Sequence, residues 1–256
     1  MNTMIPLLTK LHQQEVSRYQ NGEIPAILKA LKETAVKRDD LKKIIFIRYQ
    51  VAHFFEDMLR YMIVVIRNDT TLIRDQQEAL VSAASQNLKE ELGEFVEYGG
   101  PHREGREVLL SALGIDYQDW SKNLGTYNSP GNVSHAVKDL ILSIKEIISR
   151  GAIEAITALW YYENRISLDG VLGDYYILLH AFETQFPEFK KPAYTEGDAL
   201  WHIASHANHD EYHAGLAEDA LHKVMSLCGS QQKILTTFED MKKACDDFWN
   251  EIEKEL

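Results

Sequence analysis

The chain of 256 residues is 45% hydrophobic and 26% charged, the proportions of an ordinary globular protein. Its 39 acidic and 27 basic side chains give a formal net charge of −12, which disfavours nucleic acid and anionic membrane surfaces as partners because phosphate binding relies on clustered Lys and Arg. No apolar run approaches the roughly 18 residues of a membrane span. The N-terminus has no secretory signature, and Cys228 and Cys245 are too few for a disulfide framework, so we expect a cytoplasmic protein with reduced thiols.

Apolar residues recur at three- and four-residue spacing between the glycines and prolines, which predicts helices along most of the chain. In chain order these helices run from Asp39 or Asp40 to about Arg67, then over 75–98, 102–114, 134–166 (one helix or two, interrupted near Gly151), 173–186, 196 to about 227, and 230–256. The segment 123–132 is the one clear loop. No useful stretch alternates with the period of two that strands require, so we predict an all-α protein: a single bundle of about seven to nine helices over residues 1–256.

Five titratable side chains fall within twelve positions of the predicted helix over 196–227: His202, His206, His209, Asp210 and His213. At 100° per residue all five share one helix face, and each needs a polar partner if that face is buried. A metal site, an acid–base cluster and a solvated polar face are all compatible with the pattern. Imidazole and carboxylate are ligands that Fe, Mn, Zn and Ni accept, and Asp210 and His213 have the i, i+3 spacing of the pairs that hold two metal ions in helical bundles.

A centre of two metal ions needs carboxylates from other helices. Glu163 follows an apolar and aromatic run, where an unpaired carboxylate is costly to bury. Glu91 is a second candidate, although Glu90, Glu94 and Glu97 surround it and the group would suit an acidic surface helix equally well.

Three segments together resemble a known family. "HANHDEYHA" fits the pattern His-x3-Asp-x2-His-Ala of the heme-oxygenase-like diiron oxidases and oxygenases, whose fold is shared with thiaminase II and pyrroloquinoline-quinone synthase. "NLKEELGEFVEYGGPHREGREVLLSALGI" is similar to that family's Asn-Leu-x-x-Glu segment followed by a His, and "ALWYYENRI" to its Ala-Leu-x-x-x-Glu-x-x-Ile helix. With "RYQVAHFFEDML" as the first core helix, the resemblance covers about 40–225.

The resemblance implies a heme-oxygenase-like bundle that binds two irons, with manganese as an alternative metal. The implied ligands are Glu91, His102, Glu163, His206, Asp210 and His213. Because His102 follows Glu91 by eleven positions, a long interval for this motif, Glu94 could replace Glu91. His202 and His209 are additional imidazoles that could orient a ligand by a hydrogen bond or lie on the surface.

The resemblance also implies a function: an O2-activating nonheme diiron oxidase or oxygenase in a biosynthetic pathway. It would act on a small amine or amino-acid-derived metabolite by N-oxygenation, oxidative C–C cleavage or desaturation, with an electron donor and as a homodimer. Candidate pocket residues are Tyr49, Gln50, His53, Trp160, Tyr161 and Tyr162. An acidic, aromatic pocket would suit an ammonium substrate, although aromatic residues at helical spacing are more often core.

Other functions stay open. A cofactor-processing hydrolase or cofactorless oxidase of the same fold would use His206, Asp210 and His213 as acid and base, and a non-catalytic partner protein would use none of them. Thiaminase II fits less well because its Cys nucleophile lies in the middle of its chain, whereas both cysteines here follow position 227. Heme oxygenase would require His12 as the heme ligand and leaves the carboxylates without a role. The members that make p-aminobenzoate from their own Tyr are a further alternative.

Overall fold

The computed structural model describes the backbone of residues 5–94, 102–116 and 121–256, and the side chains of these ranges except at 5–6, 170 and 208–211. The protein is all-α, as predicted. Within the described ranges there are ten α-helices: α1 Ile5–Gln20, α2 Ala26–Lys32, α3 Arg38–Asn68, α4 Arg74–Glu91, α5 His102–Ala112, α7 His135–Ser149, α8 Ala152–Ser167, α9 Asp174–Gln185, α10 Trp201–Val224 and α11 Ser230–Glu255. The number slightly exceeds the predicted seven to nine, since α1 and α2 precede the first predicted helix.

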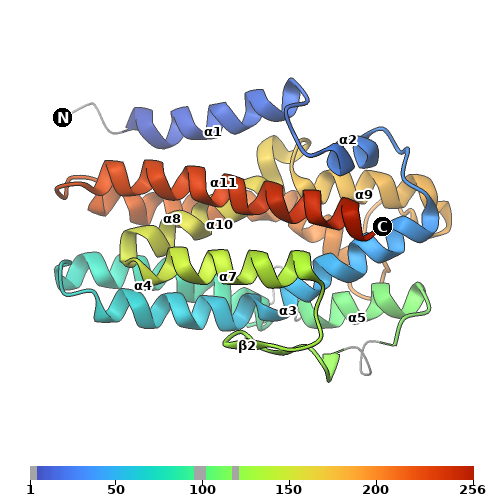
Figure 1. The fold of residues 1–256 in the computed structure, drawn as a ribbon, viewed down its shortest axis with the longest axis horizontal. Coiled ribbons are helices and arrows are strands. Elements are labelled where there is room, and N and C mark those ends of the chain that lie inside the picture. Colours follow the sequence, from blue (N-terminus) through green and yellow to red (C-terminus); the bar gives the residue numbers. More distant parts are fainter. Residues whose placement is uncertain (1–4, 95–101, 117–120) are drawn as a thin grey trace.

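Six long helices, α3, α4, α7, α8, α10 and α11, run roughly along the long axis of the bundle, with α1 alongside α11 at one edge (Figure 1). The predicted helix carrying the histidines is α10, and it packs against α8, α4, α9 and α5. Helix α11 packs against α7, α8 and α2. One continuous apolar core joins these layers, and α10 lies at its centre because helices from several distant parts of the sequence surround it.

The break between α7 and α8 falls at Gly151, where the sequence predicts it, and the backbone there has φ 152°. The predicted loop 123–132 contains a short antiparallel hairpin, β1 Gly125–Thr126 and β2 Ser129–Pro130. Two 3-10 turns, η2 Leu168–Gly170 and η3 Pro187–Phe189, follow α8 and α9. None of the described helices has the length and apolarity to cross a membrane.

Helix α4 ends at Glu91, seven residues before the end predicted at 98, and the reason is local. Gly93 adopts a left-handed backbone with φ 72°, which glycine reaches without steric cost. The Gly93 N–H donates to Glu90 O and the Glu94 N–H donates to Lys89 O, each at 2.8 Å, the hydrogen-bond pair that closes a helix C-terminus. The stop predicted at 99–101 lies outside the described residues. This early end places Glu90 and Glu91 in the last helical turn and leaves Glu94 exposed beyond it.

Gly105 allows α5 to approach α10 closely. A Cβ atom at this position would lie 2.8 Å from the ring of Trp201 and 2.9 Å from the Cβ of His202, closer than van der Waals contact permits. The absence of a side chain at Gly105 therefore helps to bring His102, at the start of α5, beside the histidines of α10.

We expect Gly105→Ala to lower the free energy of unfolding by about 1–3 kcal/mol, because the new methyl group must push α5 away from α10. Gly215→Ala is the matched control: Gly215 lies in the same α10 with open space around the position of a Cβ, so it should raise stability by about 0.5–1 kcal/mol. Urea unfolding of the two variants measures both effects. Equal stability of the two would show that the close approach at Gly105 is not a constraint.

Candidate metal centre

A cluster of imidazole and carboxylate side chains lies inside the bundle where α4, α5, α8 and α10 meet. Its described members are Glu90 and Glu91 of α4, His102 of α5, Glu163 of α8, and His202, His206 and His213 of α10. All of these residues are buried, with at most 8% of their surface exposed. Such groups are costly to bury unless each is paired, hydrogen-bonded or bound to a metal.

Three imidazoles form the first group. One nitrogen from each of His102, His202 and His206 lies within 4.8 Å of the others. The ring centroids of His102 and His206 are 4.5 Å apart and those of His202 and His206 are 4.6 Å apart. His202 and His206 are neighbours because residues four apart share a helix face, and His102 reaches them from the start of α5. Convergent imidazole nitrogens are a common ligand set for transition metals.

Two of these imidazoles are held by other side chains and keep one nitrogen without a hydrogen bond. His102 Nδ1 is 3.0 Å from Glu91 Oε1, and His202 Nδ1 is 3.3 Å from the hydroxyl of Tyr49. Within the described part of the chain, Nε2 of His102 and Nε2 of His202 are buried and have no hydrogen-bond partner. A metal ion would satisfy both atoms, and a hydrogen bond to the opposite ring nitrogen is how proteins orient metal-bound histidines. The residues present therefore fit a metal ion.

Glu90, Glu163 and His213 form the second group. His213 Nε2 and a carboxylate oxygen of Glu90 are hydrogen-bonded, and His213 Nδ1 is 4.0 Å from Glu163 Oε2. The other oxygen of Glu90 is 3.9 Å from His102 Nε2. Glu90 thus lies between the two groups and touches both.

Three residues of the cluster have pKa values shifted toward the protonation states that metal ligation requires. Burial raises the pKa of the Glu91 carboxyl, but His102 and Arg106 outweigh this effect and hold it far below its ordinary value. Burial likewise raises the pKa of Glu90, and its hydrogen bond with His213 brings the net pKa below the ordinary value. Burial, reinforced by neighbouring His206, keeps the pKa of His202 well below its ordinary value. At neutral pH Glu90 and Glu91 are therefore ionised and His202 is neutral. Burial lowers the pKa of His102, but Glu91 outweighs this effect and raises it above its ordinary value, so a metal ion bound at His102 would displace a proton.

The structure brings together five of the six predicted ligands, Glu91, His102, Glu163, His206 and His213. The side chain of Asp210, the sixth, lies outside the described residues, as does that of His209. Glu94, the alternative to Glu91, is exposed beyond the end of α4. His202 lies among the imidazoles rather than on the surface.

Two residues of the cluster were not predicted to belong to it. Glu90, expected among the acidic residues around Glu91, is buried between the two groups. Arg106 is buried on α5 and donates from Nη1 to Glu91 Oε2 at 3.4 Å. The four-residue spacing between His102 and Arg106 was the available signal, because it places both on one face of α5.

A cavity of about 10 Å³, with room for about one water molecule, adjoins the cluster. Glu91, Glu163 and His206 border it on the cluster side, together with Arg106. Tyr162, a predicted pocket residue, also lines it, as do Arg48 and Tyr175, which the sequence analysis did not select.

The other predicted pocket residues do not line this cavity. Tyr49 contacts His202 as described, and His53 is half-buried against Phe54. Trp160 packs against Phe238 of α11, and Tyr161 donates a hydrogen bond to Glu15 of α1, so both contact helices that do not contribute to the cluster. These two aromatic residues are core, as helical spacing alone favours.

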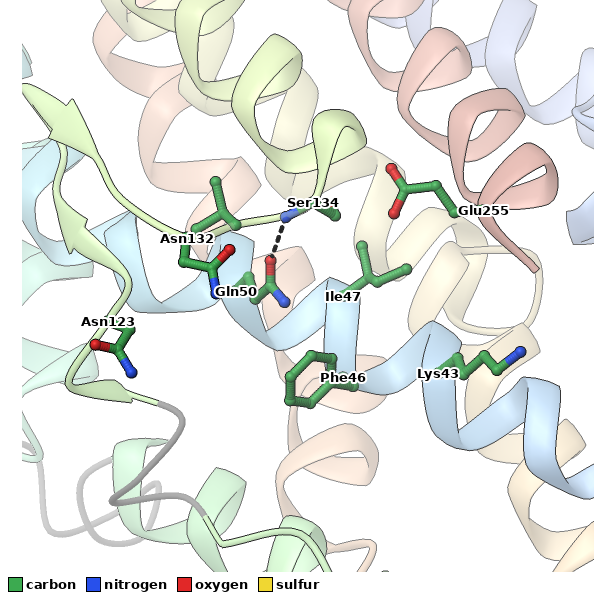
Figure 2. Close-up of a pocket in the computed structure, with 9 residues that line it drawn as sticks. Lys43, Phe46, Ile47, Gln50, Asn123, Asn132, Ser134 and Glu255 are labelled. Atoms are coloured by element: carbon green, nitrogen blue, oxygen red, sulfur yellow. Dashed lines mark hydrogen bonds between the residues drawn. The ribbon is translucent and has the colours of Figure 1, made fainter.

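Gln50 lines a groove of about 520 Å³ between α3, the segments on either side of the hairpin and the end of α11 (Figure 2). Its Oε1 accepts a hydrogen bond from the backbone N–H of Ser134 at 2.9 Å. None of the clustered histidines or carboxylates lines this groove.

His12 also lies apart from the cluster. Its ring nitrogens are 3.1 Å from Asn164 Oδ1 and 3.0 Å from Asp169 Oδ1, so both are engaged in a polar contact between α1 and the end of α8.

Comparison with known proteins gives a fold relationship. No family model and no curated protein matches the sequence. Among solved structures, the crystal structure of a CADD-like protein of unknown function from Nostoc punctiforme matches with a TM-score of 0.69 and 14% sequence identity, over 97% of this chain and 96% of that chain. The two chains therefore share a fold over nearly their whole length. The buried cluster described above is an observation on this protein alone.

We expect His202→Ala to weaken metal binding by about tenfold or more, since it removes a nitrogen that faces the other imidazoles. His222→Ala is the control, because His222 lies on the same helix with its side chain one-third exposed. Titration with Co(II), followed by its visible absorption, compares the two. Equal affinities would place His202 outside the coordination sphere.

Proposed function

We propose that this protein is a nonheme diiron oxidase or oxygenase of the heme-oxygenase-like type, acting on a small amine or amino-acid-derived metabolite. The observation that carries the proposal is the buried pair of ligand groups joined by Glu90, with an unsatisfied Nε2 on both His102 and His202. The motif resemblance in three separate segments supports it independently, since those segments supply the helices that meet at the cluster. The likeness to the CADD-like protein supports the fold alone.

In this proposal His102, His202 and His206 hold one metal ion. Glu163 and His213 hold the second, together with Asp210, whose ligand role rests on the motif. Glu90 lies between the groups and contacts both, so its carboxylate would be available to either metal ion. Glu91 orients His102 and is itself held by Arg106. Mixed imidazole and carboxylate ligands without thiolate suit iron or manganese.

Two bound Fe(II) ions would supply the electrons with which O2 is activated. The protein's own contribution is to orient the ligands, to exclude bulk water and to keep a small space beside them. Burial raises the pKa of Tyr162 far above its ordinary value, so its hydroxyl stays protonated at the edge of the cavity and can donate a hydrogen bond there. An electron donor and a homodimeric assembly belong to the proposal through the family resemblance.

Reconstitution with Fe(II) under anaerobic conditions tests the proposal. We expect about two irons per chain and O2 consumption upon mixing. His206→Ala and Glu163→Gln should each lower the iron content, because each removes a buried ligand. Glu94→Gln is the control, since Glu94 is exposed, and it should bind as much iron as the unmodified chain.

The proposal fails if the chain binds well under two irons and His206→Ala leaves that amount unchanged. Activity on a metabolite in the absence of metal would favour the hydrolase or cofactorless oxidase, with His206 and His213 as acid and base. Absence of both metal and activity would favour a non-catalytic helical partner protein.

A further inference from the structure

Arg48 of α3 is a buried cation that has no carboxylate partner among the side chains that the structure describes. Its residue is 4% exposed, and its Nη1 has no hydrogen-bond partner within the ranges that the structure describes. A buried guanidinium is costly unless it is paired and its N–H groups are satisfied. The tyrosine neighbours, including a hydrogen bond with Tyr162, and the charge of Asp174 compensate for the burial of the charge, but Nη1 itself keeps an N–H donor that is unused within the described part of the chain.

The nearby carboxylate of Asp174 is committed to other donors. Asp174 Oδ1 accepts from the Tyr19 hydroxyl at 2.5 Å, and Asp174 Oδ2 accepts from Arg165 Nε at 3.0 Å and from Trp249 Nε1 at 2.8 Å. Burial lowers the pKa of Arg48, and its tyrosine neighbours together with the charge of Asp174 outweigh that effect. Asp174 therefore acts on Arg48 through its charge and leaves Nη1 open.

Aromatic rings fix the position of the Arg48 guanidinium. Its central carbon lies 4.9 Å from the ring centroid of Tyr175 and 5.4 Å from that of Tyr162. These are cation–π distances. Tyr162, one of the aromatic residues predicted to suit an ammonium substrate, therefore already contacts a cation of the protein itself.

The same side chain lines the cavity beside the metal cluster. Arg48, Tyr162 and Tyr175 share the 10 Å³ cavity with Glu163 and His206. Arg48 and Tyr162 also line a second cavity of about 20 Å³ that extends toward Trp249. Once metal ions neutralise the clustered carboxylates, Arg48 is a fixed positive charge next to them.

We propose that Arg48 binds the carboxylate of the substrate, which makes the substrate a small carboxylic acid or amino acid held by its acid group. A guanidinium offers paired N–H groups that match the two oxygens of a carboxylate. The cavity accepts about one water molecule, the space of a single carboxylate oxygen, so the remaining substrate atoms enter by displacing side chains that line the two cavities. The substrate class deepens the proposed function, whereas the anion site itself does not require metal.

Acetate and acetamide provide a matched pair of probes that differ in charge. With the full-length chain, metal-free and Fe(II)-loaded, at constant ionic strength, we expect acetate to raise the unfolding temperature and acetamide to have no effect. Arg48→Gln should weaken acetate binding by about tenfold or more. Arg48→Lys should retain part of the affinity, because it keeps the charge and loses the paired N–H geometry.

Arg103→Gln is the control for overall charge, because Arg103 is exposed on α5, and it should bind acetate like the unmodified chain. If Arg48→Gln does not fold, the unmodified chain and Arg48→Lys still test the proposal, because acetate and acetamide can be compared on both. An equal response to the two probes, or an acetate response that survives in Arg48→Gln, overturns the proposal.

Iron content separates this proposal from the proposed function. Arg48→Gln should bind as much iron as the unmodified chain, since Arg48 is not a ligand. Acetate binding through Arg48 in a chain that takes up no iron would uphold the anion site and refute the diiron function. Binding of two irons without an Arg48-dependent acetate response would support the diiron function and refute the anion site.

Discussion

The burial of a histidine–carboxylate cluster between α4, α5, α8 and α10 is the constraint on which the rest of the structure depends. Each of these groups loses water on folding, and the bundle compensates by pairing them, as in Glu91 with His102 and Glu90 with His213. Among the described residues the pairing is incomplete at Nε2 of His102 and of His202. Buried polar atoms of this kind normally have a partner, and a metal ion is the partner that we propose.

The backbone around the cluster is adapted to that purpose. The reversal at Gly93 ends α4 just after its two buried carboxylates, and Gly105 lets α5 lie close to α10. A second buried polar network, in which Arg165 of α8 pairs with Asp174 of α9 and with Asp246 of α11, ties α8 to these two helices. Arg48 lies between the two networks, in cavities shared with each, and belongs to neither by hydrogen bonding to a carboxylate.

Much of this arrangement was predictable because it depends on local spacing. The bounds of α3, the break at Gly151 and the start of α5 at His102 follow from apolar periodicity and from glycine and proline positions. Glu163 could be singled out because a carboxylate within an apolar run is costly to bury without a partner, so its position alone indicated a polar or metal contact.

The remaining features depend on tertiary contacts. Whether Glu90 or Glu91 faces His213 is decided by the rotation of the last turn of α4 against α10, and the two residues are adjacent and chemically identical. Arg48 also stands in an apolar run, but only the packing of α3 against its neighbours reveals that its guanidinium ends beside the cluster rather than at the surface. Of the predicted aromatic pocket residues only Tyr162 lines the cavity beside the cluster, and the cation there is Arg48 of the protein itself.

Anomalous X-ray diffraction at the iron absorption edge, from crystals grown with Fe(II), tests the central claim most directly. The account predicts two neighbouring peaks inside the bundle, one against His102, His202 and His206 and one against Glu163 and His213, with Glu90 between them. Peaks only at surface carboxylates, or no peak within the bundle, would contradict it.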